Sequence, residues 1–333
     1  MLTLQVQDHT QEPVFLDRSF PTVGPTEILI RTVACALNFA DLLMIRGTYQ
    51  ETPALPFTLG MEVAGHVLAI GSAVTDFKIG DRVAAFAGSG GLAEAIAVDS
   101  ARCLIISDDL PFETAASALV SYGTSHLALT HRAKIKPGDT LLVLGAAGGV
   151  GLTAVEIGAA LGARVIAVAR GQDKLEVCRA RGADVTIDSS SEDMIAMVKA
   201  LGGVDVVFDP VGGDPFVAAL KCCKPEARYL TIGFASGNIP QIKANHLLVK
   251  NVDVMGFYWG GYLNFAPQLL SDSLTQALKM ISDGLLKPHI SAVYDFNQAL
   301  EALAHLKARK SIGKLVVRGP KTTCMYKKLV FSE

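Results

Sequence analysis

Hydrophobic and polar positions change their pattern along this chain near Pro111. Before that residue, short apolar stretches are separated by Gly and Asp, a pattern typical of β-strands joined by turns. These stretches cover residues 27–34, 36–46, 63–70, 82–86 and 93–98. The pattern predicts an irregular antiparallel barrel.

After Pro111, apolar residues at helical spacing alternate with short β-type runs. The predicted helices cover residues 112–119, 123–132, 152–161, 192–201 and 216–222. The predicted strands cover residues 140–144, 164–169, 204–208, 228–233 and 252–256. Alternation of this kind indicates a parallel, doubly wound sheet. The last part predicts a helix, a strand, a helix and a strand, over residues 274–284, 292–296, 297–308 and 314–318.

A glycine cluster follows the first of these strands, in the run LLVLGAAGGVG that ends at Gly151. Aligned on its end, the run places Ala146, Gly148 and Gly151 at the three glycine positions of G-x-G-x-x-G, with Gly145 one residue earlier. Strand, turn, helix and second strand together make one β-α-β unit of about thirty residues. Such a turn lets backbone N–H groups approach a diphosphate at a helix N-terminus. The motif predicts a dinucleotide site, with contacts from Ala147, Gly148, Gly149 and Val150; the alternative is a tight turn that binds nothing.

The end of the second strand indicates which dinucleotide binds. NAD-binding units usually place Asp or Glu there, where the acid accepts hydrogen bonds from the ribose and repels a 2′-phosphate. This chain has Ala169 at that position, followed by Arg170 and, one helical turn later, Lys174. A guanidinium and an ammonium favour a phosphate, so the prediction is NADPH. The alternative is that both are ordinary solvated charges at the start of a helix.

Composition narrows the class of protein. At 333 residues, with 50% hydrophobic and 19% charged residues, two domains with sizeable cores are expected. The formal net charge of −2 suggests no nucleic-acid or membrane-surface partner. No basic segment precedes an apolar one at the N-terminus, and no stretch has the length of a membrane span, so a soluble, cytoplasmic protein is the expectation. The six cysteines include no C-x-x-C pair and are interpreted as reduced, buried thiols.

Several motifs, in this order, resemble the zinc-independent quinone oxidoreductase branch of the medium-chain dehydrogenase/reductase superfamily, which includes zeta-crystallin-like proteins. They are NFAD at 38–41, RGTY at 46–49, PFTLGMEVAG at 56–65, KIGDRV at 78–83, KPGD at 136–139, the glycine run and IGKLV at 312–316. The resemblance implies a Rossmann doubly wound parallel sheet inserted in a GroES-like, mostly β barrel domain. The Rossmann domain would cover residues 122–262, the GroES-like domain residues 1–121 and 263–333, and the cleft between them would hold the active site.

Members of that superfamily differ in whether they bind a catalytic zinc ion. In its alcohol dehydrogenases, a cysteine takes the place of Asn38 and a histidine the place of Met61, and a four-cysteine lobe follows the place of Ala87. A neutral amide and a thioether are poor ligands for Zn²⁺, so no metal is predicted. His66, a lone histidine in an apolar strand, is interpreted as structural.

The resemblance also implies candidate site residues. Asn38 would face the nicotinamide or the substrate carbonyl, and Tyr49 could donate its phenolic proton; alternatively, Asn38 caps a helix that begins near Phe39, and Tyr49 is barrel packing. Asp41 and Glu62 are not assigned as acid or base: Asp41 is expected to hold the Asn38 loop, and Glu62 to meet a buried cation or a backbone donor.

Further cofactor contacts are implied by position in the family pattern. They are Thr124 near the nicotinamide phosphate, Gly233 and Phe234 against the nicotinamide, Gly313 and Lys314 closing over it, and the aromatic cluster of Phe257, Tyr258 and Trp259. The cluster would stack on a quinone or, alternatively, make a domain or subunit contact. Edge-to-edge pairing of the last Rossmann strand in relatives implies a homodimer.

A metal-free site suits acceptors whose reduced anion is delocalised. The predicted activity is therefore NADPH-dependent reduction of quinones or α,β-unsaturated carbonyls. The alternatives are an enoyl-thioester reductase and a non-enzymatic NADPH-binding structural protein. The tail beyond Pro320 is expected to be a disordered end or an added edge strand.

Overall fold

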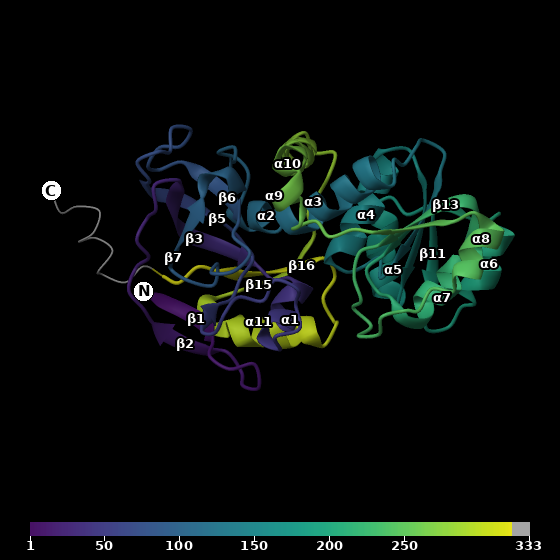
Figure 1. The fold of residues 1–333 in the computed structure, drawn as a ribbon, viewed down its shortest axis with the longest axis horizontal. Coiled ribbons are helices and arrows are strands. Elements are labelled where there is room, and N and C mark those ends of the chain that lie inside the picture. Colours follow the sequence, from purple (N-terminus) through teal and green to yellow (C-terminus); the bar gives the residue numbers. More distant parts are fainter. Residues whose placement is uncertain (322–333) are drawn as a thin grey trace. The chain divides into compact units, whose positions relative to one another are not determined.

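The structure is a computed structural model that describes residues 1–321. The chain divides into two compact units (Figure 1). One is formed by Met1–Val120 together with the chain from His289 onward, and the other by Ser121–Pro288. The predicted tail beyond Pro320 lies almost entirely outside the described residues.

The first unit is built on two sheets. Among the described residues, the larger has seven strands, with β15-β16-β3-β5-β6-β8 in order and β7 paired to β3, and the smaller has the order β2-β1-β4. The strands are β1 (Leu2–Val6), β2 (Val14–Asp17), β3 (Glu27–Ala36), β4 (Phe57–Thr58), β5 (Glu62–Ile70), β6 (Arg82–Phe86), β7 (Ala95–Asp99), β8 (Cys103–Ile105), β15 (Ile290–Tyr294) and β16 (Lys314–Arg318). Register shifts between β3 and β5 mark bulges, which bend the sheet as a barrel requires.

The helices of this unit are α1 (Phe39–Ile45), α2 (Phe112–Ala116) and α11 (Ala299–Lys307). Residues 36–46, grouped above with the strands, are mostly helical, because β3 ends at Ala36 and Asn38 begins α1. A helix that begins near Phe39, which was expected from the sequence if Asn38 is a cap, is thus confirmed. The short strands β1, β2 and β8 were not predicted, since runs of three to five residues give little periodic signal.

The second unit contains the predicted parallel sheet. Its order, β11-β10-β9-β12-β13-β14, reverses direction at β9, as a doubly wound sheet requires. The strands are β9 (Thr140–Leu144), β10 (Arg164–Ala169), β11 (Val185–Asp188), β12 (Val204–Asp209), β13 (Cys223–Thr231) and β14 (Asp253–Gly256), and all their pairings are parallel. The helices are α3 (Leu119–Leu127), α4 (Gly149–Ala160), α5 (Gln172–Ala180), α6 (Met194–Ala200), α7 (Gly213–Cys222), α8 (Ala244–Lys250), α9 (Tyr262–Phe265) and α10 (Pro267–Ser282).

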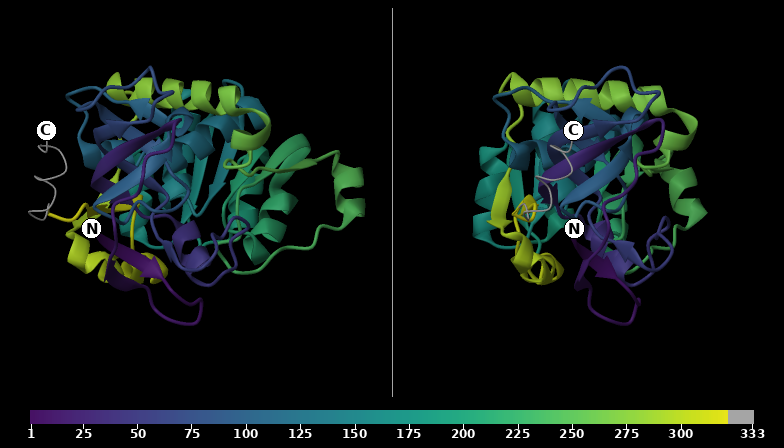
Figure 2. Two further views of the ribbon diagram at one scale, coloured as in Figure 1. Left: turned by 60° about the vertical axis from the view of Figure 1, so that its left-hand side comes forward. Right: turned by 90° about the vertical axis from the view of Figure 1, so that its left-hand side faces the viewer.

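Helices cover both faces of this sheet (Figure 2). On one face, Leu142 and Ile166 pack in a core with Val198 of α6 and Phe216 of α7. On the other face, α4 comes so close that a Cβ on Gly158 would lie 2.5 Å from a methyl carbon of Leu141. Alternate residues of a strand point to opposite faces, so the all-apolar strands predicted from the sequence are those that helices bury on both sides.

One strand and one domain boundary differ from those inferred from the sequence. The strand β11 was missed, because VTID is short and polar at alternate positions. Residues 263–288 group with the second unit, whereas the resemblance placed them with the barrel. The reason is the packing of α10 on α3: Ser273 Oγ lies 2.7 Å from His126 Nδ1, and Leu274 lies against Gly123.

The five cysteines within residues 1–321 are free and buried, as predicted; Cys324 lies outside them. No helix in that part of the chain combines the length and the apolar character needed to cross a membrane.

Candidate functional site

The glycine loop between β9 and α4 makes an unusually close turn. Gly145 has φ +57°, and Gly148 donates its N–H to the Gly145 carbonyl at 2.9 Å. A Cβ on Gly151 would lie 2.2 Å from that same carbonyl oxygen, so only glycine permits α4 to begin here. The tight turn is therefore made at Gly145, and Ala146, which the alignment put at the first glycine position, instead donates its N–H to Val168.

The N-terminus of α4 is suited to an anion. The N-cap residue of α4 is Gly148, which has no side chain to accept a hydrogen bond from the first N–H groups of the helix. The first N–H groups of a helix have no partner within it, and the helix dipole places partial positive charge there. In α4 these groups belong to Gly149, Val150 and Gly151, beside the exposed Gly148. This geometry fits the predicted diphosphate contacts.

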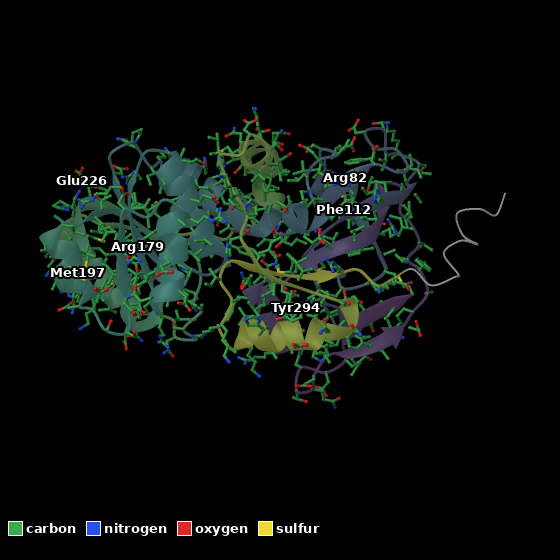
Figure 3. All side chains as sticks on the ribbon, turned by 180° about the vertical axis from the view of Figure 1, so that it is seen from behind. Arg82, Phe112, Arg179, Met197, Glu226 and Tyr294 are labelled. Atoms are coloured by element: carbon green, nitrogen blue, oxygen red, sulfur yellow. The ribbon has the colours of Figure 1, made fainter. Side chains whose placement is uncertain are left out.

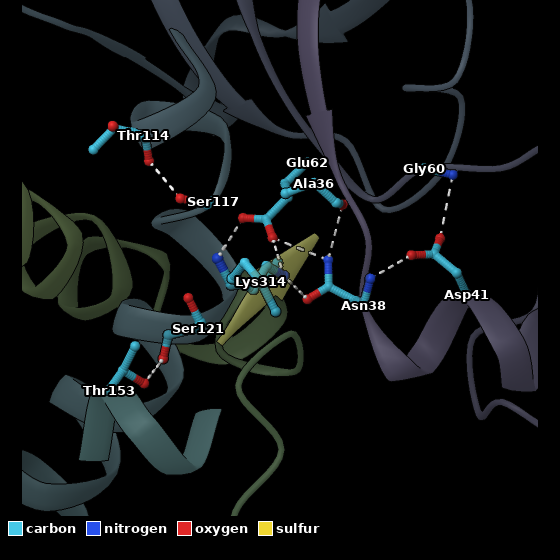
Figure 4. A network of polar contacts seen from close by, with 11 residues as sticks. Ala36, Asn38, Asp41, Gly60, Glu62, Thr114, Ser117, Ser121, Thr153 and Lys314 are labelled. Atoms are coloured by element: carbon cyan, nitrogen blue, oxygen red, sulfur yellow. Dashed lines mark hydrogen bonds and ion pairs between the residues drawn. The ribbon is translucent and has the colours of Figure 1, made fainter. Parts of the chain in front are cut away.

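Helix α3, which carries Thr124, is bonded to the beginning of α4. Ser125 Oγ donates to the Val150 carbonyl at 2.9 Å and lies 2.8 Å from Thr153 Oγ1. Thr153 Oγ1 donates to the Ser121 carbonyl at 3.0 Å (Figure 4). These bonds fasten α3 to the first turn of α4. Trp259 also packs on α3, since a Cβ on Gly123 would lie 2.9 Å from its indole ring.

The aromatic cluster is part of the interior. Phe257 and Trp259 are buried, and the Phe257 ring lies 5.5 Å from that of Tyr262. Tyr262 in turn lies 4.6 Å from the exposed ring of Phe265. Packing within the unit therefore accounts for much of this cluster, and a stacking role for Phe257 and Trp259 stays a prediction.

Two cations meet at the end of β10. Arg170 is exposed and Lys174 half-buried, and they flank Gly171, the N-cap residue of α5. Burial lowers the pKa of Lys174, and the nearby positive charge of Arg170 lowers that pKa further. Arg170 and Lys174 repel each other, and both are repelled by the partial positive charge at the N-terminus of α5. An anion bound there would be attracted by both side chains and by the helix dipole.

The loops after β12 and β13 are held by Asp209, the last residue of β12. Its buried carboxylate accepts hydrogen bonds from the N–H groups of Val211 at 2.7 Å and Gly212 at 2.9 Å, and from Tyr229 Oη at 2.8 Å. Burial raises the pKa of this carboxyl. The Asp209 carbonyl accepts the Gly233 N–H at 3.3 Å, so the predicted pair of Gly233 and the partly exposed Phe234 is placed by this residue.

In the first unit, Asn38 starts α1 and Asp41 holds its loop. The Asp41 carboxylate accepts the Asn38 N–H at 2.7 Å and the Gly60 N–H at 3.2 Å, which confirms the expected role of Asp41 (Figure 4). Asp41 is completely buried, and burial raises its pKa from 3.8 to about 6. Asn38 does occupy the N-cap position, while its amide is directed at other partners.

The amide of Asn38 joins a buried ion pair. Lys314 Nζ donates to Glu62 Oε1 at 2.8 Å and to Asn38 Oδ1 at 2.7 Å, and Asn38 Nδ2 donates to Glu62 Oε1 at 3.0 Å (Figure 4). Glu62 Oε2 accepts the Val120 N–H at 2.8 Å. Glu62 thus meets both a buried cation and a backbone donor, as expected.

Gly313 fixes the start of β16 and hence the position of Lys314. It has φ +65°, and a Cβ there would lie 2.3 Å from the carbonyl oxygen of His289. In this structure the Lys314 ammonium serves the ion pair with Glu62; the cofactor contacts implied for Gly313 and Lys314 stay predictions.

Two further residues of the first unit were considered from sequence. Tyr49 is half-buried in the turn after α1, where its carbonyl accepts the Thr52 hydroxyl at 2.8 Å, and its catalytic role stays a prediction. The ring of His66 lies 4.9 Å from that of Phe112. The guanidinium of Arg82 lies 3.9 Å from the centre of the same Phe112 ring; Figure 3 labels Arg82 and Phe112. His66 therefore has a packing role.

Sequence reasoning did not single out Asp188 or Asp209. Both are the last residues of buried parallel strands, β11 and β12, and both carboxylates accept N–H groups of the loop that follows. The available signal was an acid at the end of each short β-type run, Asp188 before Ser189 and Asp209 before Pro210.

Comparison with known proteins gives consistent results for both parts of the chain. Residues 24–108 match the alcohol dehydrogenase GroES-like domain, and residues 149–282 match the zinc-binding dehydrogenase family. The chain is 40% identical over 314 residues to the quinone oxidoreductase-like protein 2 homolog of Nematostella vectensis, covering 92% of this chain and 86% of that protein.

Solved structures show the same likeness. A Pseudomonas syringae quinone oxidoreductase superposes with a TM-score of 0.88 at 32% identity, covering 95% of this chain and 99% of that one. A Thermus thermophilus quinone oxidoreductase, determined alone and in complex with NADPH, superposes with a TM-score of 0.85 at 33% identity, covering 96% of this chain and all of that one. These matches agree with the predicted GroES-like and Rossmann architecture.

The residues present do not fit the zinc that one family description implies. Where zinc would need thiolate and imidazole, Asn38 offers an amide and Met61 a thioether, and the Lys314 ammonium, which has no lone pair, already lies between Asn38 and Glu62. Within residues 1–321, no group of three His, Cys, Asp or Glu side chains is arranged to hold a metal ion.

Replacing Gly151 with alanine tests the close turn. The added Cβ would overlap the Gly145 carbonyl oxygen, so we expect Gly151→Ala to lower the free energy of unfolding by about 2 kcal/mol or more. Urea unfolding followed by circular dichroism measures this. Gly256→Ala is the matched control, because its Cβ meets nothing within 4 Å. Equal stability of the two variants would contradict the proposed packing.

The raised pKa of Asp41 predicts a pH dependence of stability. Between pH 4 and 6 the folded state retains a proton that the unfolded chain has lost, so stability falls as pH rises through this window and levels off above it. The full effect is about 3 kcal/mol. The difference in unfolding free energy between the wild type and Asp41→Asn, measured at several pH values, isolates this contribution. Parallel curves would contradict it.

Breaking the buried ion pair should be costly because Glu62 would lose its buried counter-ion. We expect Lys314→Met to destabilise the protein by about 3–5 kcal/mol, and Glu62→Gln in the same chain to restore most of that loss. Lys279→Met, in the exposed pair with Asp283, serves as the control and should cost less than about 0.5 kcal/mol. A double variant no more stable than Lys314→Met would contradict this account.

Proposed function

Since this chain belongs to the quinone oxidoreductase-like branch of the medium-chain dehydrogenase/reductase superfamily, we propose that it is an enzyme that uses NADPH to reduce quinones or α,β-unsaturated carbonyl compounds without a metal. Such acceptors take up a hydride readily, because the resulting anion is delocalised onto oxygen. The protein then has to position two planar groups and stabilise an oxyanion.

The observation that carries the choice of cofactor is the charge at the end of β10. Arg170 and Lys174 lie around the N-cap residue of α5, and Ala169 stands where an NAD-binding unit carries an acid. The mutual repulsion of the two cations supports a bound dianion at this place. The Thermus thermophilus relative was solved in complex with NADPH.

The proposed cofactor contacts run along the carboxyl edge of the parallel sheet. Ala147, Gly148, Gly149 and Val150 would hold the diphosphate, with Thr124 beside them, and Arg170 and Lys174 would hold the 2′-phosphate. Contacts to the nicotinamide end are proposed for Gly233, Phe234, Phe257, Trp259, Gly313 and Lys314. When bound, NADPH supplies a hydride from its nicotinamide ring.

We propose that Asn38 and Lys314 together stabilise the oxyanion that develops on the acceptor. Both Asn38 Nδ2 hydrogen bonds are already made, to Glu62 and to the Ala36 carbonyl, so the amide is well placed to orient Lys314. The Lys314 ammonium has three N–H donors, of which Glu62 and Asn38 take two. The third is available to a developing oxyanion, with Tyr49 as a second proposed donor.

We also propose a homodimer. Among the described strands, β14 pairs only with β13 and forms an edge of the sheet, which leaves its outer side for a second copy of the chain.

The cofactor proposal predicts a charge-dependent preference. Wild-type protein should bind NADPH at least tenfold more tightly than NADH at low salt, because only NADPH carries the 2′-phosphate. The double variant Arg170→Ala with Lys174→Ala should lose this preference while keeping its NADH affinity. Calorimetric titration measures both affinities, and Arg179→Ala, on the last turn of α5, controls for a general loss of positive charge. Equal binding of both coenzymes by the wild type would contradict the proposal.

Turnover decides between activities. NADPH oxidation is followed with benzoquinone, naphthoquinone, enone and enoyl-coenzyme A acceptors. The proposal expects the first three to be reduced. Lys314→Met with Glu62→Gln, which removes the charge but keeps the pair neutral, should lower kcat by a larger factor than it weakens NADPH binding. Exclusive use of the thioester would instead identify an enoyl-thioester reductase, and tight NADPH binding with no turnover a binding protein.

A further inference from the structure

A carboxylate lies directly beside the strand end that lacks its acid. Strands β10 and β11 are parallel neighbours, and Ala169 is paired with Asp188 in their register. Asp188 Oδ2 accepts the N–H of Gly171, which stands between Arg170 and the start of α5, at 3.3 Å. The neighbouring strand therefore brings a negative charge to the position that β10 leaves to alanine.

Asp188 is held in this place and stays ionised. Its Oδ1 accepts the N–H of Ser190 at 2.9 Å and the hydroxyl of Ser190 at 2.6 Å. These hydrogen bonds, and to a smaller degree the charge of Arg170, keep the pKa of the Asp188 carboxyl below its ordinary value. Asp188 is a buried residue.

Three charges thus surround the turn that follows β10. Arg170 and Lys174 attract a phosphate, whereas Asp188 attracts Arg170 and repels a phosphate. A carboxylate at this strand end is also the group that accepts hydrogen bonds from an unphosphorylated ribose, and Oδ2 is engaged only by the Gly171 N–H among the described residues.

We propose that Asp188 is a specificity-determining residue of the cofactor site, which weakens the preference for a 2′-phosphorylated coenzyme and so allows NADH to be used as well. This inference rests on the proposed NADPH site. Asp188 acts partly through Arg170, because it competes with the 2′-phosphate for the guanidinium. Discrimination between the coenzymes is then set by the balance of these three side chains.

The test is Asp188→Asn, which removes the charge and keeps an oxygen to accept the Gly171 N–H. We expect the ratio of NADPH to NADH affinity to rise roughly three- to tenfold at low salt and the gain to shrink at high salt. Binding of each coenzyme is measured by calorimetry. Glu192→Gln is the matched control. Among the described residues, the Glu192 carboxylate bonds only the backbone N–H of Asp188, and a glutamine oxygen can accept the same bond, so the ratio should stay unchanged.

A second background tests the route through Arg170. In Arg170→Met protein, Asp188→Asn should change the ratio less than it does in the wild type. Asp188→Ser, which also removes the charge, replaces Asp188→Asn if the latter does not fold. The inference is overturned if both affinities fall together and the ratio stays constant, which is the result expected of a purely structural carboxylate.

The two proposals fail differently. If wild-type protein binds both coenzymes equally, the proposed NADPH preference is wrong, but a rise of the ratio in Asp188→Asn still supports the role of Asp188. If the wild type prefers NADPH and Asp188→Asn leaves that preference unchanged, only the inference about Asp188 is wrong.

Discussion

Buried carboxylates that accept backbone N–H groups hold several of the loops on which candidate site residues lie. In the first unit, Asp41 bonds the N–H groups of Asn38 and Gly60, and Glu62 bonds that of Val120. In the second, Asp188 and Asp209 do the same for the turns after β11 and β12. Each acid loses hydration on folding and is stabilised only if those donors stay in place, so the loops are fixed as firmly as the strands that carry them.

The buried carboxylates have different charged surroundings in the two units. In the second unit Asp188 and Asp209 end strands at the carboxyl edge of the parallel sheet, the edge at which α4 and α5 begin and at which we propose a site for an anion. In the first unit Glu62 and Lys314 form a buried ion pair. We propose that this ammonium stabilises the developing oxyanion of the acceptor.

The sequence predicted those features whose signal is local. The strand from Thr140, the glycine run and the helix after it lie within some twenty residues, and each reinforces the others. The group around Asn38 was predicted only in part, because Lys314 lies 276 residues away and no pattern reports which cation meets Glu62. The roles of Gly145 and Asp188 depend on a carbonyl position and on strand register, which a single sequence does not specify.

The central claim is that cations at the end of β10 hold the 2′-phosphate of NADPH as a dianion. Phosphorus-31 NMR of NADP⁺ bound to the protein, titrated with pH, observes that phosphate directly. The account predicts that the second pKa of the phosphate, about 6 when free in water, falls well below that value on binding, because Arg170 and Lys174 favour the charged form. A phosphate that titrates in the complex as it does in water would contradict the account.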